Sequence, residues 1–179
     1  MSGSPYWKTP MTQPILTTNR LTLRALRPED AGDVVRALND FEVSKWLTPV
    51  PYPYSVHDAN WFTRRVASKA FVFGLEFQGR IIGTIGCEGE FGYWLGRASW
   101  GQGLMTEAAR AVLSAYFAKG HDQIEAGYFR ENARSSQVLR KMGFVETGQS
   151  RSFSLAQGQE VNRIDMILTR EAFEARNGN

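Results

Sequence analysis

The clearest pattern of hydrophobic and polar positions lies between Gly92 and Phe117. Apolar residues recur there every three or four positions, as on the buried face of a helix: Leu104, Met105, Ala108, Ala109, Val112, Leu113, Tyr116 and Phe117. Before them, residues 93–95 form the short apolar run of a strand, and Gly101 and Gly103 stand between the two segments. The pattern predicts a strand, a glycine turn and a long helix in direct succession.

Weaker patterns predict the rest of the chain. Short or alternating apolar runs predict strands over 20–26, 70–77, 80–87, 90–95, 124–129, 144–154 and 161–169. Helical spacing and capping residues predict helices over 28–39, 41–46, 55–67, 132–142 and 170–176. Residues 1–14 contain three prolines and no periodicity, so we expect a flexible N-terminal extension and one domain over 15–179. This order predicts an α/β sheet with helices on both faces, without distinguishing among α/β folds.

Composition narrows the class of protein. With 179 residues, 42% hydrophobic and 22% charged, the chain can build a real core. A net charge of +3 suits a polyanionic ligand, but the absence of a Lys/Arg block does not favour nucleic acid. No apolar stretch has the length of a membrane span and no signal peptide is recognisable, so we expect a cytoplasmic protein without membrane contact.

Metal and disulfide chemistry are not expected. The single cysteine, Cys87, lies in an apolar run and is expected to be a small buried hydrophobe. His57 and His121 stand alone, without the cluster of ligands that a metal site needs.

The glycine turn is a candidate anion site. Because Gly101 and Gly103 lack Cβ atoms, the amides of the turn and of the first helical turn can contact a ligand, and pyrophosphate is the usual occupant. An ordinary tight turn before a helix is the simpler alternative. A P-loop is excluded because no Gly-Lys pair occurs, and Thr106 occupies the position where the dinucleotide fingerprint needs a small residue.

Three motifs in order resemble a known family. The stretch WGQGLMTEA, from Trp100 to Ala108, resembles the central acyl-CoA-binding motif of the GNAT superfamily of N-acetyltransferases. Residues 90–95 (EFGYWL) and 132–144 (NARSSQVLRKMGF) resemble the flanking motifs of its RimJ/RimL-like branch, the ribosomal-protein N-terminal acetyltransferases. One departure is Ala98, where the superfamily usually has Arg or Gln.

The resemblance spans about residues 18–173 and implies a fold and an activity. The fold is the acyl-CoA N-acyltransferase fold, an α/β (α+β) architecture whose mixed, mostly antiparallel central sheet is flanked by helices. The activity is acetyl transfer from acetyl-CoA to a primary amine by direct attack in a ternary complex. The implied acceptor is a protein or peptide α-amine, such as a ribosomal protein N-terminus. No metal is implied. Candidate cofactor-binding residues are Trp94, Leu95, Trp100, Gly101, Gln102, Gly103, Leu104, Met105 and Asn132.

Candidate catalytic groups follow from the chemistry of the transfer. The attacking amine must lose a proton, and Glu76, Glu88 and Glu90 are candidate bases. Glu90 is favoured because it opens the strand next to the glycine turn and a Glu there is the base in some relatives; a solvated strand-end carboxylate is the alternative. The resemblance implies that the backbone N–H of Leu95, freed by a strand bulge, holds the oxyanion.

The departing thiolate gains from a proton donor. Many superfamily members use a Tyr where this chain has Leu139, and the RimJ/RimL-like pattern instead offers the Ser135 hydroxyl. Ser135 is alternatively a helix-capping residue, and Asn132 fits both a cap and a cofactor contact. Four arginines are candidates for the 3′-phosphate of the coenzyme: Arg97, Arg130, Arg134 and Arg140.

The acceptor side is the least determined. Residues 46–54 combine three prolines with Trp46, Tyr52 and Tyr54, and no carboxylate occurs from Trp46 to His57. This stiff aromatic segment favours an extended peptide with a small first residue, Ala or Ser, over a polyamine. Packing of the helices onto the sheet is the simpler reading of these aromatics. Other functions left open are a small-molecule (polyamine or drug amine) acetyltransferase, a non-catalytic CoA-binding domain, and an interaction protein with an incidental glycine turn.

Overall fold

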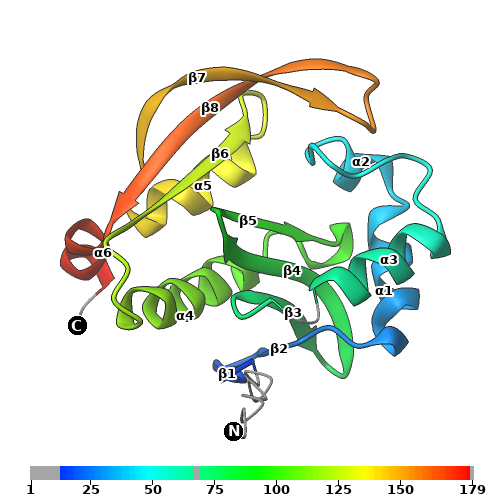
Figure 1. The fold of residues 1–179 in the computed structure, drawn as a ribbon, viewed down its shortest axis with the longest axis horizontal. Coiled ribbons are helices and arrows are strands. Elements are labelled where there is room, and N and C mark those ends of the chain that lie inside the picture. The colour runs from blue at the N-terminus through cyan, green and yellow to red at the C-terminus, as the bar shows by residue number, and fades with distance from the viewer. Residues whose placement is uncertain (1–12, 67–68, 178–179) are drawn as a thin grey trace, which may run out of the picture.

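The computed structural model describes residues 13–66 and 69–177, and eight of their segments form one sheet (Figure 1). The spatial order is β1-β2-β3-β4-β5-β6-β8-β7. Every neighbouring pair is antiparallel except β5 and β6, which confirms a mixed, mostly antiparallel sheet. The strands are β1 Leu16–Thr17, β2 Thr22–Arg24, β3 Val72–Phe77, β4 Arg80–Glu88, β5 Glu90–Leu95, β6 Gln123–Phe129, β7 Val145–Ser154 and β8 Gln159–Thr169.

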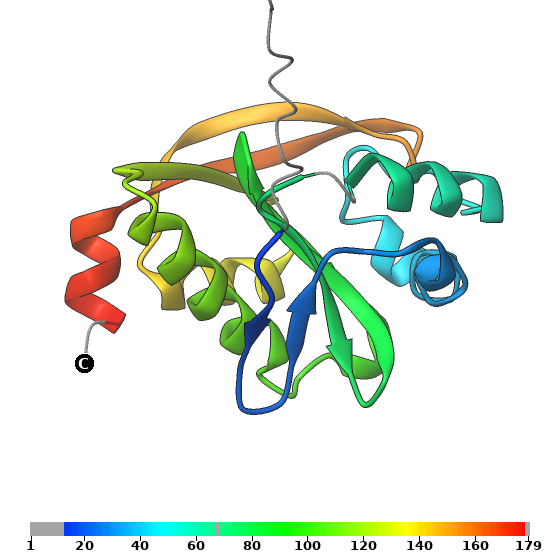
Figure 2. The same cartoon turned by 60° about the horizontal axis from the view of Figure 1, so that its bottom comes forward.

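Helices cover both faces of the sheet. Figure 2 shows α4 and α5 on one side of the strands and α1 to α3 on the other. The helices are η1 Pro28–Asp30, α1 Ala31–Leu38, α2 Phe41–Ser44, α3 Val56–Val66, η2 Arg97–Ser99, α4 Leu104–Ala118, α5 Ala133–Met142 and α6 Arg170–Asn177. No helix of the described ranges is both long and apolar enough to cross a membrane.

Each face has its own core, and β5 contributes to both. Phe91 belongs to the larger core with α4 and α5, and Tyr93 and Leu95 pack against it. Trp94 belongs to the second core, between the sheet and α1 to α3. Because alternate residues of a strand point to opposite faces, β5 is anchored from both sides. Of the eight residues predicted to form the apolar face of α4, seven are buried, and Tyr116 is partly buried against the larger core.

Most predicted elements are present with shifted ends. The strand expected over 20–26 is only Thr22–Arg24, and the helix expected over 41–46 ends at Ser44. The two-residue strand β1 has no sequence prediction, because two residues are too few to show a period. The extension predicted for 1–14 lies outside the described residues except for its last two positions, as does Ala67.

The strands β5 and β6 separate after a short pairing. Their register joins Glu90 to Glu125 and Phe91 to Ala126 and ends there. From that point β6 continues to pair with β8 as far as Phe129, and β6 turns away from β5 (Figure 1). The remaining length of β5 therefore has a sheet partner on one side only.

A hairpin bridges this opening. The turn between β7 and β8 reaches the segment after α2, where Gln157 Nε2 donates to Lys45 O at 2.7 Å. Close by, the N–H of Leu155 donates to Thr48 O at 3.3 Å. Figure 1 shows the hairpin arching across the molecule to this contact. The opening is thus enclosed on the side of α2.

Candidate active site

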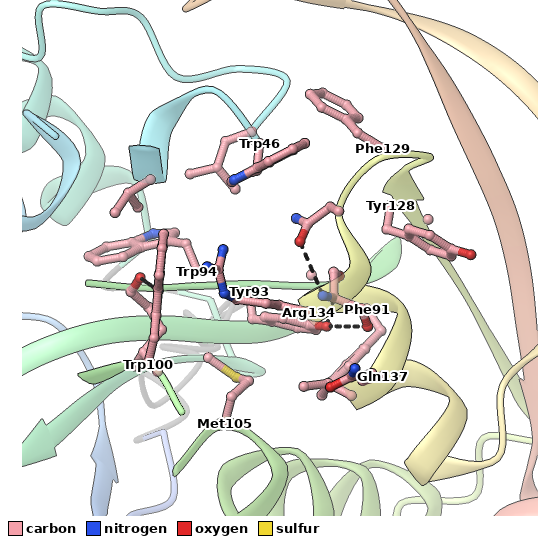
Figure 3. A pocket seen from close by; sticks show the side chains of 18 of the residues that line it. Trp46, Phe91, Tyr93, Trp94, Trp100, Met105, Tyr128, Phe129, Arg134 and Gln137 are labelled. Carbon is pink, nitrogen blue, oxygen red and sulfur yellow. Dashed lines mark hydrogen bonds between the residues drawn. The ribbon is translucent and has the colours of Figure 1, made fainter. Parts of the chain in front are cut away.

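The opening between β5 and β6 is a cavity of about 650 Å³. In Figure 3, Trp46 lies at one end of it and Met105 at the other, with Trp94 and Trp100 on one side and Tyr128 and Phe129 opposite. Eight of the nine residues expected to bind a cofactor line it: Trp94, Leu95, Trp100, Gly101, Gly103, Leu104, Met105 and Asn132.

The ninth, Gln102, faces away. Its side-chain Nε2 donates to Ala98 O at 3.1 Å, and its carbonyl accepts from Arg20 Nη1 at 2.9 Å. The Gln102 side chain therefore does not take part in the cavity, and the prediction that Gln102 contacts a cofactor rests on its backbone N–H alone.

Leu95 presents its peptide to the cavity. Its carbonyl oxygen accepts a hydrogen bond from Trp100 Nε1 at 2.7 Å, whereas the next N–H, of Gly96, donates to Ile82 O of β4 at 2.8 Å. Because successive residues of a strand point their peptide groups to opposite edges, the Leu95 N–H points away from β4, towards the opening.

The bulge expected at Leu95 is absent. The β4–β5 register runs without a shift from Glu88↔Glu90 to Gly83↔Leu95. The Leu95 amide lacks a ladder partner because β6 has turned away from β5. The Leu95 N–H is thus free of the sheet, as expected, but because β6 diverges and not because β5 is bulged.

The glycine turn leaves a row of amides without partners. Gly101 and Gly103 have φ values of 74° and 75°, a left-handed conformation that side chains disfavour. Gly103 is the N-cap of α4, and the N–H groups of Leu104, Met105 and Thr106 donate to no other group in the described part of the chain. These donors, at the positive end of a helix of fifteen residues, are suited to an anion, as the sequence predicts.

Arg20 supports this turn from outside, which the sequence does not suggest. Besides its bond to Gln102 O, its Nε lies 2.7 Å from Glu107 Oε2. Partial burial opposes the charge of Glu107, but hydrogen bonds from Thr18 and Arg20 outweigh it and lower its pKa below the ordinary value. The ion pair ties the turn to the first full turn of α4.

Ser135 faces a second hydroxyl, that of Tyr93. Ser135 Oγ lies 2.9 Å from the Tyr93 hydroxyl, which also donates to Ser135 O at 3.2 Å (Figure 3). Burial raises the pKa of Tyr93 above its ordinary value, so the phenol stays protonated. The Tyr93 hydroxyl lies at the cavity, although the sequence pattern shows Tyr93 only as part of the apolar run of a strand. The signal available was that neighbouring strand residues point to opposite faces, so Tyr93 and Trp94 cannot both face the same core.

The capping role belongs to Asn132, not to Ser135. Asn132 Oδ1 accepts from the Ser135 N–H at 3.2 Å and is the N-cap of α5. The alternative that Ser135 is the cap is therefore wrong, and the Ser135 hydroxyl does not cap α5.

Of the three candidate carboxylates, only Glu90 lines the cavity. Glu76 pairs with Arg24 and Glu88 with Lys69, both outside it. Glu90 is itself engaged, because Arg163 Nη2 donates to both of its carboxylate oxygens, at 2.8 and 2.7 Å.

The predicted arginines do not gather at one place. Arg97 lies 3.9 Å from Asp40, Arg130 bonds Gln149 and Arg140 bonds Glu146. Only Arg134 lines the cavity, with its guanidinium carbon 4.3 Å from the centre of the Trp100 ring. Lys141 also lines it and was not predicted.

The aromatic segment before α3 splits between cavity and core. Trp46 lines the cavity, together with Leu47, Thr48 and Pro49. Tyr54 is buried in the core beneath α1 and α3, and Tyr52 packs against Phe41 at the surface. The expected aromatic wall is therefore Trp46 alone.

Cys87 is buried in the larger core, and burial, with a smaller effect from Glu88, raises the pKa of its thiol to about 12. Among the described residues, no group of three or more His, Cys, Asp or Glu could hold a metal ion.

Comparison with known proteins adds the family. The model of the acetyltransferase (GNAT) domain matches residues 20–145. The SPbeta prophage-derived uncharacterized N-acetyltransferase YokL of Bacillus subtilis is 28% identical, over 90% of this chain and 97% of its own. The [ribosomal protein uS5]-alanine N-acetyltransferase of Escherichia coli is 29% identical, over 86% and 90%. RimJ of Mycobacterium smegmatis in complex with CoA-disulfide superposes with a TM-score of 0.73 at 24% identity, over 89% and 88%.

Proposed function

The chain belongs to the GNAT family of N-acetyltransferases, and we propose that it moves the acetyl group of acetyl-CoA directly onto the α-amine of a protein or peptide. The predicted RimJ/RimL-like branch agrees with the relatives, which include a ribosomal-protein alanine N-acetyltransferase. The observation that carries the proposal is the cavity between β5 and β6, where an outward amide, a pair of hydroxyls and a row of free helix amides converge.

The cofactor is proposed to lie along β5. The free amides of Leu104, Met105 and Thr106 suit the pyrophosphate of acetyl-CoA, and CoA is present in the RimJ structure. Lys141, which borders both the cavity and the depression beside α4, is suited to a phosphate further along the coenzyme. The thioester would then reach the end of β5, next to Leu95.

Each step of the transfer then has a group beside it. The amine nitrogen attacks the thioester carbonyl, and the Leu95 N–H stabilises the negative oxygen of the tetrahedral intermediate. Collapse of that intermediate breaks the carbon–sulfur bond, and the Ser135 hydroxyl supplies the proton to the departing thiolate. The surplus proton of the amine leaves to water or to Glu90, and the Ser135 oxygen recovers a proton from water, so the net transfer is one proton from the amine to CoA.

Direct transfer is favoured over an acetyl-enzyme intermediate. The chain has one cysteine, and its buried, weakly acidic thiol is a poor nucleophile. In initial-rate kinetics we expect intersecting double-reciprocal lines for acetyl-CoA and acceptor. Parallel lines would indicate an acetylated intermediate.

The α-amine suits a cavity whose carboxylate is already held by an arginine. Since Glu90 already holds Arg163, the acceptor must lose its proton with little help. An α-amine has a pKa of about 7.7–8.0 and is partly neutral near pH 7.5, whereas a lysine or polyamine amine, near 10.4, is almost fully protonated.

The charges of the cavity also disfavour a polyamine. Its charged lining residues are Glu90, Arg134, Lys141 and Arg163, one anion against three cations. A polycation would enter this field against repulsion.

The test is a side-by-side comparison of kcat/KM on peptides beginning with Ala or Ser, on spermidine and on an aminoglycoside, by release of CoA thiol. We expect the peptides to be preferred. A higher kcat/KM for any polyamine or aminoglycoside would contradict the α-amine assignment. Binding of acetyl-CoA without thiol release on any amine would instead indicate a non-catalytic CoA-binding domain.

A further inference from the structure

One polar atom of the cavity has no partner. The indole Nε1 of Trp46 is buried, yet no described residue accepts its hydrogen bond. An indole nitrogen is a donor only, so it needs an acceptor atom, and a buried donor without one is rare in folded proteins. Trp46 lines the cavity, and its Nε1 is closed to water in this structure, so the acceptor is a ligand atom that the N–H meets after a small turn of the ring.

Trp46 lies at the part of the cavity where the amine substrate is expected to enter, opposite the proposed coenzyme site. Trp46 follows α2, which lies with α1 and α3 on one face of the sheet, whereas the glycine turn leads into α4 on the other face (Figure 2). Figure 3 shows the Trp46 ring at the end of the cavity remote from Met105, with its nitrogen on the edge turned towards Tyr93 and Trp94. A molecule approaching the end of β5 from this face passes the Trp46 ring.

The backbone that carries the ring is held in position. The carbonyls of Lys45 and Thr48, on either side of Trp46 in the chain, accept hydrogen bonds from Gln157 and Leu155 of the β7–β8 turn. Lys45 Nζ lies 5.0 Å from the centre of the Trp46 ring and is itself bonded to Glu42. The backbone on both sides of the ring is therefore held before any ligand arrives, and only the side-chain torsions of Trp46 adjust, which keeps the entropic cost low.

We propose that the Trp46 N–H donates to the carbonyl oxygen of the acceptor's first residue, and thereby selects an amine that has a carbonyl group close to it. The inference rests on the proposed transfer to an α-amine. Every peptide α-amine has such a carbonyl one carbon away, whereas a lysine ε-amine or a protonated polyamine has no acceptor atom near its nitrogen.

The test combines a protein change with a substrate change. The variant Trp46→Phe removes the N–H and keeps an aromatic ring. The substrates are Ala-Ala-Ala amide and its (E)-alkene isostere, in which a carbon–carbon double bond replaces the first peptide bond and its carbonyl. We expect Trp46→Phe to lower kcat/KM at least tenfold on the peptide, about 1.4 kcal/mol, and less than twofold on the isostere. The ratio of the two losses cancels differences in amine reactivity.

Two controls separate recognition from packing. Trp61→Phe makes the same change at an exposed tryptophan of α3, 59% accessible and outside the cavity, and should leave both substrates unaffected. Replacing Trp46 with benzothienylalanine keeps the two-ring shape, puts sulfur in place of N–H, and should reproduce the selective loss.

The possible results are distinguishable. Equal losses on both substrates, or no loss on the peptide, would overturn the role of the Trp46 N–H while leaving the acetyl transfer intact. If the wild-type protein acetylates no peptide at all but releases CoA with other amines, the acceptor assignment fails, and this inference fails with it.

Discussion

Replacing Ser135 with alanine tests the proposed proton donor with little disturbance of the fold. The N-cap bond of α5 joins the Ser135 N–H to Asn132 Oδ1 and survives the change. What is lost is the 2.9 Å contact between Ser135 Oγ and the Tyr93 hydroxyl, and Tyr93 keeps its bond to Ser135 O. One hydrogen bond contributes about 0.5–1.5 kcal/mol, so the free energy of unfolding should fall by no more than that.

The effect on rate should be much larger. Loss of a placed general acid typically costs 10²–10⁴-fold, roughly 3–5 kcal/mol of transition-state stabilisation. Because burial keeps the Tyr93 phenol protonated, its single hydrogen can shift from Ser135 O to Ser135 Oγ and leave the serine hydrogen for the departing sulfur. We therefore expect kcat of Ser135→Ala to fall at least 100-fold, while the calorimetric Kd for acetyl-CoA changes less than threefold.

The neighbouring serine provides a matched control. Ser136 Oγ accepts from Arg140 Nε at 3.2 Å on the same helix and does not line the cavity, so Ser136→Ala should retain kcat. If folded Ser135→Ala keeps kcat within threefold of the wild type, Ser135 is not the donor. A large loss in Tyr93→Phe together with a small one in Ser135→Ala would transfer the role to the phenol.

Three further predictions concern the anion site, the cysteine and an ion pair. Gly103→Asp puts a side chain at φ 75° and a negative charge beside the free amides, so calorimetry should show at least tenfold weaker acetyl-CoA binding; unchanged affinity in a folded variant would exclude this site. Cys87→Ala should retain kcat, because the buried thiol takes no part in direct transfer; mass spectrometry that finds acetyl-Cys87 during turnover would contradict it. Burial opposes the charge of Asp30, but hydrogen bonds from the Arg24 side chain and the Arg27 N–H outweigh it and lower its pKa. Its contribution to stability is therefore complete above about pH 4 and is lost as pH falls through the folded pKa. In urea unfolding the difference between the wild type and Asp30→Asn should shrink from pH 7 to pH 3, and a constant difference would refute the linkage.

The parts of the fold that sequence could predict are those with a local physical cause. The helix α4 is amphipathic over fifteen residues, and Gly103 precedes it in a conformation that favours glycine. Asn132 and Gly143 bound α5 by capping rules that act within a few residues. The separation of β5 from β6 has no local signal, because it depends on how far β6 follows β8.

Sequence motifs predicted those candidate site residues that lie within one motif. They did not predict the contacts between residues far apart in the chain. The glycine turn and Ser135 were found from contiguous motifs. The Arg163–Glu90 pair joins residues 73 positions apart, and the bond from Gln157 to Lys45 that fixes the Trp46 segment spans 112. A strand pattern shows that Glu90 is the first residue of β5, but it does not show which side chain Glu90 contacts.

The ion pair with Arg163 changes the interpretation of Glu90. Arg163 reaches it from β8 by passing over Gly127 of β6, where a Cβ atom would lie 1.9 Å from Arg163 Nε. The pair therefore depends on a glycine in the strand between, and it spans the point where β5 and β6 begin to separate. A carboxylate in this position joins β5 to β8 where β5 and β6 separate, and both of its oxygens already hold an arginine. An enzyme with such a base depends on an acceptor that is already partly neutral, which is a property of peptide α-amines and not of lysine side chains.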